Sequence, residues 1–228
     1  MHNALVIAID GPAASGKSTT ARRVAQQLGY VYVDSGAMYR AATLAVLRDG
    51  VSPDDRPGVE TCVASHTIAL RSDSRSSVIV LLDGDDVTSQ IRSAAVTAAV
   101  SLVSSYAGVR SRMVTVQQQL GTHGGVVMDG RDIGTVVFPD ADLKIFMVAD
   151  LAARAQRRHV ELARAGVLPE TEDETRRQIA ARDAFDSSRS ESPLKRAHDA
   201  VVLDTSNLSI DEQVARVVEL ARQRMESA

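Results

Sequence analysis

A glycine-rich stretch near the start of the chain, GPAASGKST at positions 11–19, has residue types suited to binding phosphate. It matches the pattern G-x-x-x-x-G-K-[ST], in which two glycines let the backbone wrap and point successive N–H groups at an anion. Lys17 supplies a full charge to the β- and γ-phosphates, and Ser18 offers a hydroxyl to Mg²⁺. The pattern predicts that the loop Gly11–Ser18 binds a nucleotide polyphosphate and its magnesium ion; a chance glycine-rich turn is the alternative.

Arginines gather in or near the loops that should lie beside this one. Moving a phosphoryl group between two anionic substrates requires cations around both, so these arginines favour phosphoryl transfer. A solvated helix surface with i, i+4 ion pairs would explain either helical cluster taken singly. There are four clusters: Arg40; Arg131; Arg154, Arg157 and Arg158; and Arg182 and Arg189 with Asp186 between them. The spacing within each of the last two places its residues on one helix face.

A third stretch, DGRDIGTVVFPDA, begins where a buried strand is expected to end. A carboxylate at such a position, here Asp129, is costly without a partner. Arg131 and Asp132 follow with opposite charges in one tight turn. They either form a structural ion pair or present an arginine to a phosphate beside a carboxylate for a base or a sugar, and the sequence leaves both interpretations open.

Three classes of protein fit a phosphate loop: a small-molecule or nucleotide kinase, a GTPase-type switch, and an ATP-binding protein without phosphotransfer of its own. The only lysines are Lys17, Lys144 and Lys195, and none follows an asparagine, so the N-K-x-D stretch that reads guanine is absent. This absence counts strongly against the GTPase. The arginines favour a kinase over a passive ATP-binding module.

Five apolar runs alternate with helical patterns and should form a parallel sheet: ALVIAID, YVYVDSG, GVVMDG, LKIFMVAD and AVVLDTS. Each is short and rich in branched residues, as in strands that are buried on both faces. Helices on both sides would give a three-layer α/β core, in which ligands bind beyond the carboxyl ends of the strands. We therefore expect five loops to converge on one cleft: Gly11–Ser18, Asp34–Arg40, Asp129–Gly134, Asp150 and Asp204–Ser206.

The region 54–91 departs from this alternation. HTIALRS and SVIVLLDG read as two strands joined by the polar turn DSRS, so we expect an inserted antiparallel patch here. The next segment, 94–121, reads as a helix that is broken around SSYAG. Two capping boxes, Thr171 with Glu174 and Ser209 with Glu212, should begin the last two helices.

Composition narrows the class of protein further. The 228 residues carry a net charge of −3, which argues against broad binding to nucleic acid or to membrane surfaces. No apolar run approaches the roughly 18 residues that span a bilayer. Cys62 is the only cysteine, so no internal disulfide can form, which suits the cytoplasm. We expect a cytoplasmic monomer in which Cys62 is structural and the histidines, which lack metal-ligand spacing, have surface or structural roles.

Several stretches together resemble bacterial cytidylate kinases: DGPAASGKST, DSGAMYRAATL, DGRDIGTVVFPDADLKIF, the segment from Arg182 to Arg189, and AVVLDTS. The resemblance runs nearly end to end, and DSGAMYR with DGRDIGTVVFPDA at this separation is its most specific part. It implies a kinase that transfers the γ-phosphoryl group of Mg-ATP to CMP or dCMP, giving ADP and the diphosphate. Another small-acceptor P-loop kinase and a non-catalytic ATP-binding module are the alternatives. Ala14 stands where the family often has glycine; because it is neither of the two defining glycines, we expect phosphate binding to survive.

The resemblance also implies an organisation and a set of roles. The P-loop core would comprise 1–53, 92–150 and 190–228, with a monophosphate-binding insert at 54–91 and a short helical lid with arginine-bearing helices at 151–189. ATP would be held by Gly11, Pro12, Ala13, Ala14, Ser15, Gly16, Lys17, Ser18 and Thr19, with Ser18 as the metal ligand. CMP would be bound by Ser35, Arg40, Ser101, Arg110, Arg131, Asp132, Arg182, Asp186 and Arg189. Catalytic charge would come from Lys17, Arg131, Arg154, Arg157 and Arg158.

Overall fold

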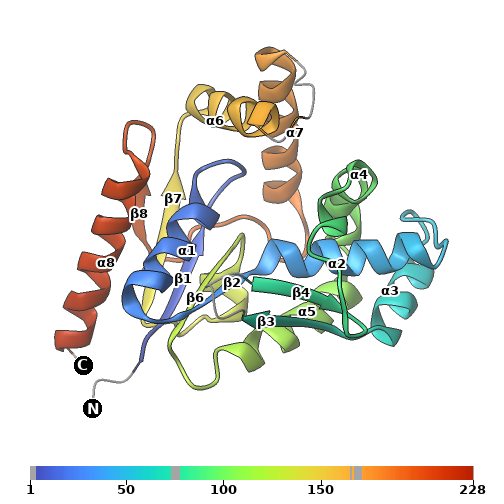
Figure 1. The fold of residues 1–228 in the computed structure, drawn as a ribbon, viewed down its shortest axis with the longest axis horizontal. Coiled ribbons are helices and arrows are strands. Elements are labelled where there is room, and N and C mark those ends of the chain that lie inside the picture. The colour runs from blue at the N-terminus through green and yellow to red at the C-terminus, as the bar shows by residue number, and fades with distance from the viewer. Residues whose placement is uncertain (1–3, 73–77, 165, 167–170, 228) are drawn as a thin grey trace.

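A parallel sheet of five strands runs through the centre of the molecule, in the order β2-β6-β1-β7-β8 (Figure 1). The computed structural model describes residues 4–72, 78–164, 166 and 171–227. The central strand of the sheet, β1, pairs in parallel with β6 on one side and with β7 on the other. The five runs expected from the sequence all form strands: β1 (Val6–Asp10), β2 (Val31–Asp34), β6 (Val126–Gly130), β7 (Leu143–Val148) and β8 (Val201–Asp204).

Helices cover both faces of this sheet, so the predicted three-layer core is confirmed. Side chains alternate across a strand, and β1 shows the consequence: Ile7 and Ile9 face one core cluster, while Ala8 faces the other. Ile7 and Ile9 pack with α1 (Lys17–Leu28) and α8 (Ile210–Ser227), whereas Ala8 packs with α2 (Ser35–Arg48) and α5 (Ala107–Leu120). Burial on both faces explains why these strands are apolar runs rather than alternating patterns.

The predicted insertion is a second, antiparallel sheet that packs against α2. Its strands are β3 (Ile68–Ser72), β4 (Val78–Leu82) and the two-residue β5 (Asp85–Asp86). The insert also contains the helix α3 (Arg56–Ser65), which the sequence pattern did not distinguish, and a 3₁₀ turn, η1 (Gln90–Arg92). The predicted turn DSRS, 73–76, lies outside the described residues.

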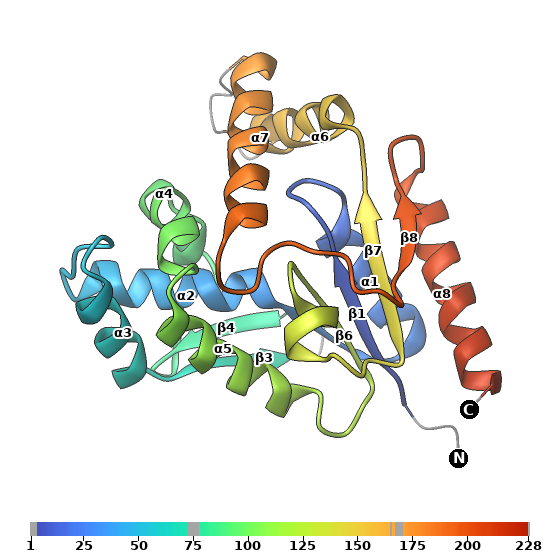
Figure 2. The same cartoon turned by 180° about the vertical axis from the view of Figure 1, so that it is seen from behind.

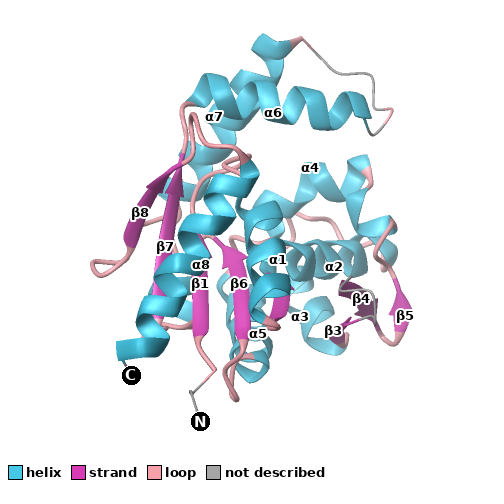
Figure 3. Ribbon diagram, turned by 60° about the vertical axis from the view of Figure 1, so that its left-hand side comes forward, coloured by secondary structure: helices cyan, strands magenta, loops and turns pink. Residues whose placement is uncertain are grey.

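Two helices, α6 (Leu151–Arg164) and α7 (Glu172–Ser188), lie beyond the carboxyl ends of the strands (Figures 2 and 3). The expected capping box of Thr171 and Glu174 begins α7. Helix α7 descends toward α4 (Ala94–Val103), which is separated from α5 by the predicted break at Ser104–Tyr106. Among the described residues, no helix combines the length and the apolar character needed to cross a membrane.

Candidate active site

The phosphate loop connects β1 to α1, as its sequence predicts. Gly16 is the N-cap of α1 with φ 94°, and Gly11 has φ 151°; both angles favour glycine. Ala14 has φ 57°, a left-handed conformation that costs a residue with a side chain about 1–2 kcal/mol. The glycine that the family often has at this position would avoid that cost.

Gly11 meets a second constraint, because a Cβ atom there would lie 2.2 Å from the backbone oxygen of Met147 in β7. We expect Gly11→Ala to lower the free energy of unfolding by more than about 2 kcal/mol, since backbone must move to make room. Gly29→Ala is the matched control: Gly29 also has positive φ (69°), but no atom of the described residues lies within 4 Å of its Cβ position. It should cost only about 1–2 kcal/mol. Urea unfolding of both variants measures the difference, and equal losses would contradict the steric argument.

Lys17 lies at the start of α1 with its side chain folded back over its own loop. Its Nζ donates to the carbonyl of Pro12 at 2.6 Å and to Oγ of Ser15 at 3.4 Å. Burial, and then the charge of Arg131, lower the pKa of this ammonium group. Bringing in an anion would reverse that effect, because an opposite charge stabilises the ammonium form.

Two adjoining pockets open at the carboxyl ends of the strands, beside the phosphate loop. The first, of about 200 Å³, is lined by residues of α2, η1, the loop after β6 and the end of α7. The second, of about 350 Å³, lies between the phosphate loop, α4, α6 and α7. Both pockets are lined by Ser18, Arg40, Arg131 and Arg182. The arrangement can therefore hold two ligands that meet at a strip of positive charge.

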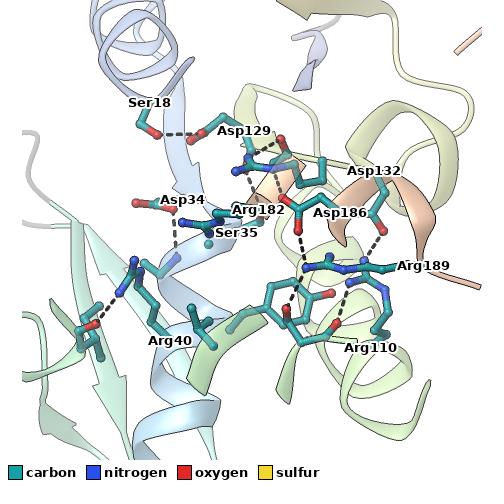
Figure 4. Close-up of a pocket in the computed structure, with 18 of the residues that line it drawn as sticks. Ser18, Asp34, Ser35, Arg40, Arg110, Asp129, Asp132, Arg182, Asp186 and Arg189 are labelled. Atoms are coloured by element: carbon teal, nitrogen blue, oxygen red, sulfur yellow. Dashed lines mark hydrogen bonds and ion pairs between the residues drawn. The ribbon is translucent and has the colours of Figure 1, made fainter. Parts of the chain in front are cut away.

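Ion pairs organise the first pocket (Figure 4). Arg110 and Asp132 form a buried pair. Asp186 is buried and accepts from two arginines, Arg131 Nε at 2.9 Å and Arg189 Nη2 at 2.5 Å. Arg131 and Asp132 are thus not paired with each other, although they are adjacent; each takes its partner from another helix. The structural ion pair that the sequence left open is not formed.

Two further arginines carry charge that is less fully paired. Arg182 Nε is buried and has no hydrogen-bond partner among the described residues. Burial, and then repulsion from Arg131, lower the pKa of Arg182 to about 10, so it is still charged at neutral pH. Arg40 donates to the carbonyl of Ile91 at 3.2 Å and to Thr97 Oγ1 at 2.9 Å. Positive charge therefore faces the boundary of the two pockets.

The arginines of α6 do not all reach the pockets. Arg158 lines the second pocket and pairs with Glu161 at 2.9 Å. Arg154 pairs with Asp183 of α7 and donates to the carbonyl of Ala13, and Arg157 donates to the backbone oxygens of Thr205 and Ser206. Arg154 and Arg157 contact the phosphate loop and the β8–α8 loop and do not line either pocket. Ser101 lines the second pocket and not the first.

Asp129 places its carboxylate oxygens beside the phosphate loop. It accepts from Ser18 Oγ at 2.8 Å and from the Tyr32 hydroxyl at 2.8 Å. Burial, and then the charge of Asp34, raise the pKa of the Asp129 carboxyl. A divalent cation there would favour its ionised form. A hydroxyl and a carboxylate side by side are hard oxygen donors of the kind that Mg²⁺ prefers, so these residues fit that ion.

Sequence reasoning missed several residues that hold the site together. Asp10 ends β1 and accepts from the backbone N–H groups of Ile133 and Gly134, both at 2.8 Å, which fixes the turn after Asp132. Burial raises the pKa of Asp10 to about 6. Its place at a strand end, directly before the phosphate loop, was an available signal. Asp183 accepts from Ala13 N at 3.1 Å, and Thr205 Oγ1 donates to the carbonyl of Ser15 at 2.9 Å. Both residues lie in stretches that the sequence singled out, Arg182–Arg189 and Asp204–Ser206, but neither was given a role there.

Comparisons with known proteins agree on one family. The model of the family described as cytidylate kinase matches residues 7–223. A cytidylate kinase of Geobacillus sp. (strain WCH70) is 47% identical over 225 residues, covering 99% of this chain and 100% of the relative. That of Chlorobaculum tepidum is 49% identical over 227 residues, covering 97% and 94%. Among solved structures, a gluconokinase from Sinorhizobium meliloti 1021 is similar in fold, with a TM-score of 0.50 at 14% identity over 99% of this chain and 97% of that one.

Proposed function

The chain belongs to the cytidylate kinase family, and from this premise we propose that it transfers the γ-phosphoryl group of Mg-ATP to CMP or dCMP. One observation carries the proposal: two pockets meet at a boundary that both line with Ser18, Arg40, Arg131 and Arg182. Phosphoryl transfer between two nucleotides needs such a place, where cations surround the donor and the acceptor phosphates together.

ATP occupies the side of the phosphate loop in this proposal. Backbone N–H groups of the loop and the positive end of α1 receive the β- and γ-phosphates, and Lys17 adds a mobile charge. The oxygens of Ser18 and Asp129 would hold Mg²⁺, which when bound neutralises charge on the β- and γ-phosphates. Arg158 lines the same pocket and faces the phosphates, whereas Arg154 and Arg157 act by positioning the phosphate loop and the β8–α8 loop.

CMP occupies the first pocket. Arg40, Arg131 and Arg182 lie at the boundary and would receive its phosphate. The Arg110–Asp132 pair and Arg189 lie deeper and would read the base, together with Ser35, whose hydroxyl donates to the carbonyl of Asp129 at 2.7 Å. Asp186 would meet the sugar; the same role for Ser101 stays a prediction, because Ser101 lines the second pocket and not this one. We also propose the division that the resemblance implies, with 54–91 as the monophosphate-binding insert, of which Ile91 lines the first pocket, and with the core and the lid as given above.

The reaction needs no general base. An oxygen of the CMP phosphate is already ionised, and it forms a bond to the γ-phosphorus as the bond to the β,γ-bridging oxygen breaks. ADP leaves with that electron pair. What the chain supplies is alignment of the two phosphates and stabilisation of the charge that spreads over the transferring group. Since one chain lines both pockets, we propose that it acts as a monomer.

A panel of acceptors tests the proposal. With Mg-ATP fixed, release of ADP in a coupled assay should be fast with CMP and dCMP. For UMP, kcat/KM should be lower by about 100-fold or more, because hydrogen-bonding sites discriminate strongly between a donor and an acceptor at one position. AMP and GMP should give no release above the ATPase background.

Other results with this panel of acceptors would indicate other functions. Preferred turnover of another monophosphate would show that the protein is a kinase with a different acceptor. Silence with every acceptor, together with calorimetric binding of Mg-ATP, would indicate a passive ATP-binding module and overturn the proposal.

A further inference from the structure

A cluster of metal-ligating side chains lies at the other end of α2, away from both pockets. Asp49 caps the C-terminus of α2, Cys62 belongs to α3, and His66 caps the C-terminus of α3. Their ligand atoms all lie within 4.8 Å of one another. Ser35, at the first pocket, begins the same 14-residue helix, so about 20 Å of helix separates the cluster from the site of phosphoryl transfer.

The distances within the cluster match those between ligands of one tetrahedral zinc ion. Cys62 Sγ lies 3.5 Å from Asp49 Oδ2, and His66 Nε2 lies 3.1 Å from the same oxygen. Zinc bonds of about 2.3 Å to sulfur and about 2.0 Å to nitrogen and oxygen, at tetrahedral angles, would put these pairs about 3.5 Å and about 3.3 Å apart. Two of the three pairs therefore already have the spacing that one zinc ion requires, and the third, between Cys62 and His66, is within 4.8 Å.

His66 is already oriented as a metal ligand would be. Its Nδ1 lies 2.5 Å from Asp83 Oδ2, and the other oxygen of Asp83 accepts from Thr67 N at 2.7 Å. A carboxylate that holds the distal ring N–H of a histidine fixes its tautomer and directs the other nitrogen at a metal. With Nδ1–H donated to Asp83, Nε2 would present its lone pair to an ion that His66 shares with Asp49 and Cys62.

The charges around the cluster also suit a divalent cation. A thiolate at Cys62 and the carboxylate of Asp49 would together balance two positive charges. Because the thiolate is the metal-binding form of cysteine, cation binding would displace the thiol proton. Two basic side chains near the cluster are engaged with other atoms: Arg48 donates to Gln90 Oε1, and Arg112 donates to the backbone carbonyl of His66.

We propose that Asp49, Cys62 and His66 form a binding site for one zinc ion, with Asp83 positioning His66 and the fourth ligand position open to water. The site joins the end of α2, the end of α3 and the β4–β5 turn, and so fastens the insert to the core. Zinc is preferred over Mg²⁺ and Ca²⁺ because thiolate and imidazole are softer ligands than those ions accept.

The test uses untagged protein that has been stripped with a chelator and titrated without nucleotide. Calorimetry with Zn²⁺ should show one ion per chain. Cys62→Ser and His66→Gln should each weaken binding by more than about 100-fold, and Asp83→Asn by about 10-fold, since losing a ligand exceeds the 10–100-fold effect of outer partners. His198→Gln, at an exposed histidine outside the cluster, should bind as the wild type does.

Cobalt gives an independent readout. Co²⁺ bound by Cys62 should produce a thiolate-to-metal charge-transfer band that is absent in Cys62→Ser, and circular dichroism verifies that each variant is folded. Absence of stoichiometric Zn²⁺ binding, binding that Cys62→Ser and His66→Gln leave unchanged, or a cobalt complex without the band would each overturn the proposal. The cluster would then be a hydrogen-bonded junction between α2, α3 and the β4–β5 turn.

Discussion

Lys17→Met should lower kcat with CMP by about 10²- to 10³-fold, the loss that follows removal of one preorganised donor from a charge-stabilising site. Lys17 lines the pocket assigned to ATP together with Arg40, Arg131 and Arg158. Its ammonium group is buried and close to Arg131, and this repulsion is relieved when a polyphosphate arrives. The interaction therefore gains strength as charge moves onto the transferring group, which is why kcat should fall more than KM rises. Steady-state kinetics with Mg-ATP varied at saturating CMP measures both parameters.

Lys144→Met is the matched control. Lys144 is also a buried lysine, but it lies near the amino end of β7, pairs with Asp199 at 2.8 Å and lines neither pocket. Its replacement should leave kcat within a few-fold of the wild type. Equal kcat values for Lys17→Met and the wild type would contradict the role of Lys17.

Asp132→Ala should remove the preference for CMP over UMP, reducing the ratio of kcat/KM values by about 10²-fold or more. Cytosine presents the N4 amine, a donor that the carboxylate of Asp132 can accept, whereas uracil presents a carbonyl at that place. In the structure Asp132 is held by Arg110, which donates also to the carbonyl of Ser104 at 2.9 Å. The acceptor atom is thus fixed before the substrate arrives. Competing CMP and UMP in one reaction gives the ratio directly.

Removing Asp132 also leaves the Arg110 charge buried without its partner, which should cost about 3–5 kcal/mol of stability. Asp132→Asn therefore accompanies the alanine variant, because it keeps the size and one oxygen acceptor. Asp199→Ala controls for the loss of a carboxylate from a buried cation, Lys144, outside both pockets. A ratio that stays at the wild-type value in folded Asp132→Ala protein would exclude a base-reading role for this residue.

The sheet and the phosphate loop could be predicted because their causes are local. Apolar runs of five or six residues that end in Asp10, Asp34 or Asp129 specify buried strands, and the glycines at 11 and 16 have backbone angles that few other residues adopt. Helix α3 was missed since its sequence, RPGVETCVAS, contains proline and glycine near its start. The proline stands in the first turn, where it is tolerated, and Asp55 caps the helix by accepting from Gly58 N.

The partners of the charged residues could not be predicted from spacing. Arg131 and Asp132 are neighbours in the chain but pair with Asp186 and Arg110, which are 55 and 22 positions away. The shared helix face of Arg154, Arg157 and Arg158 was correctly inferred. The face alone does not predict that Arg154 pairs with Asp183 or that Arg157 donates to the carbonyl of Thr205. Such pairings depend on how helices pack above the sheet. The resemblance to a family identified the candidate site residues, whereas their interaction partners are seen only in the folded structure.

One helix, α7, touches both halves of the cleft. Asp183 holds an amide of the phosphate loop, Asp186 holds Arg131 and Arg189, and Arg182 lines both pockets. Because a helix moves as a rod, a nucleotide that displaces it on one side must shift the charges awaiting the other nucleotide. Under the proposed function, binding of donor and acceptor would then be energetically linked, and the linkage would be the same in both directions. The nucleotide that binds first would then change the affinity of the protein for the second.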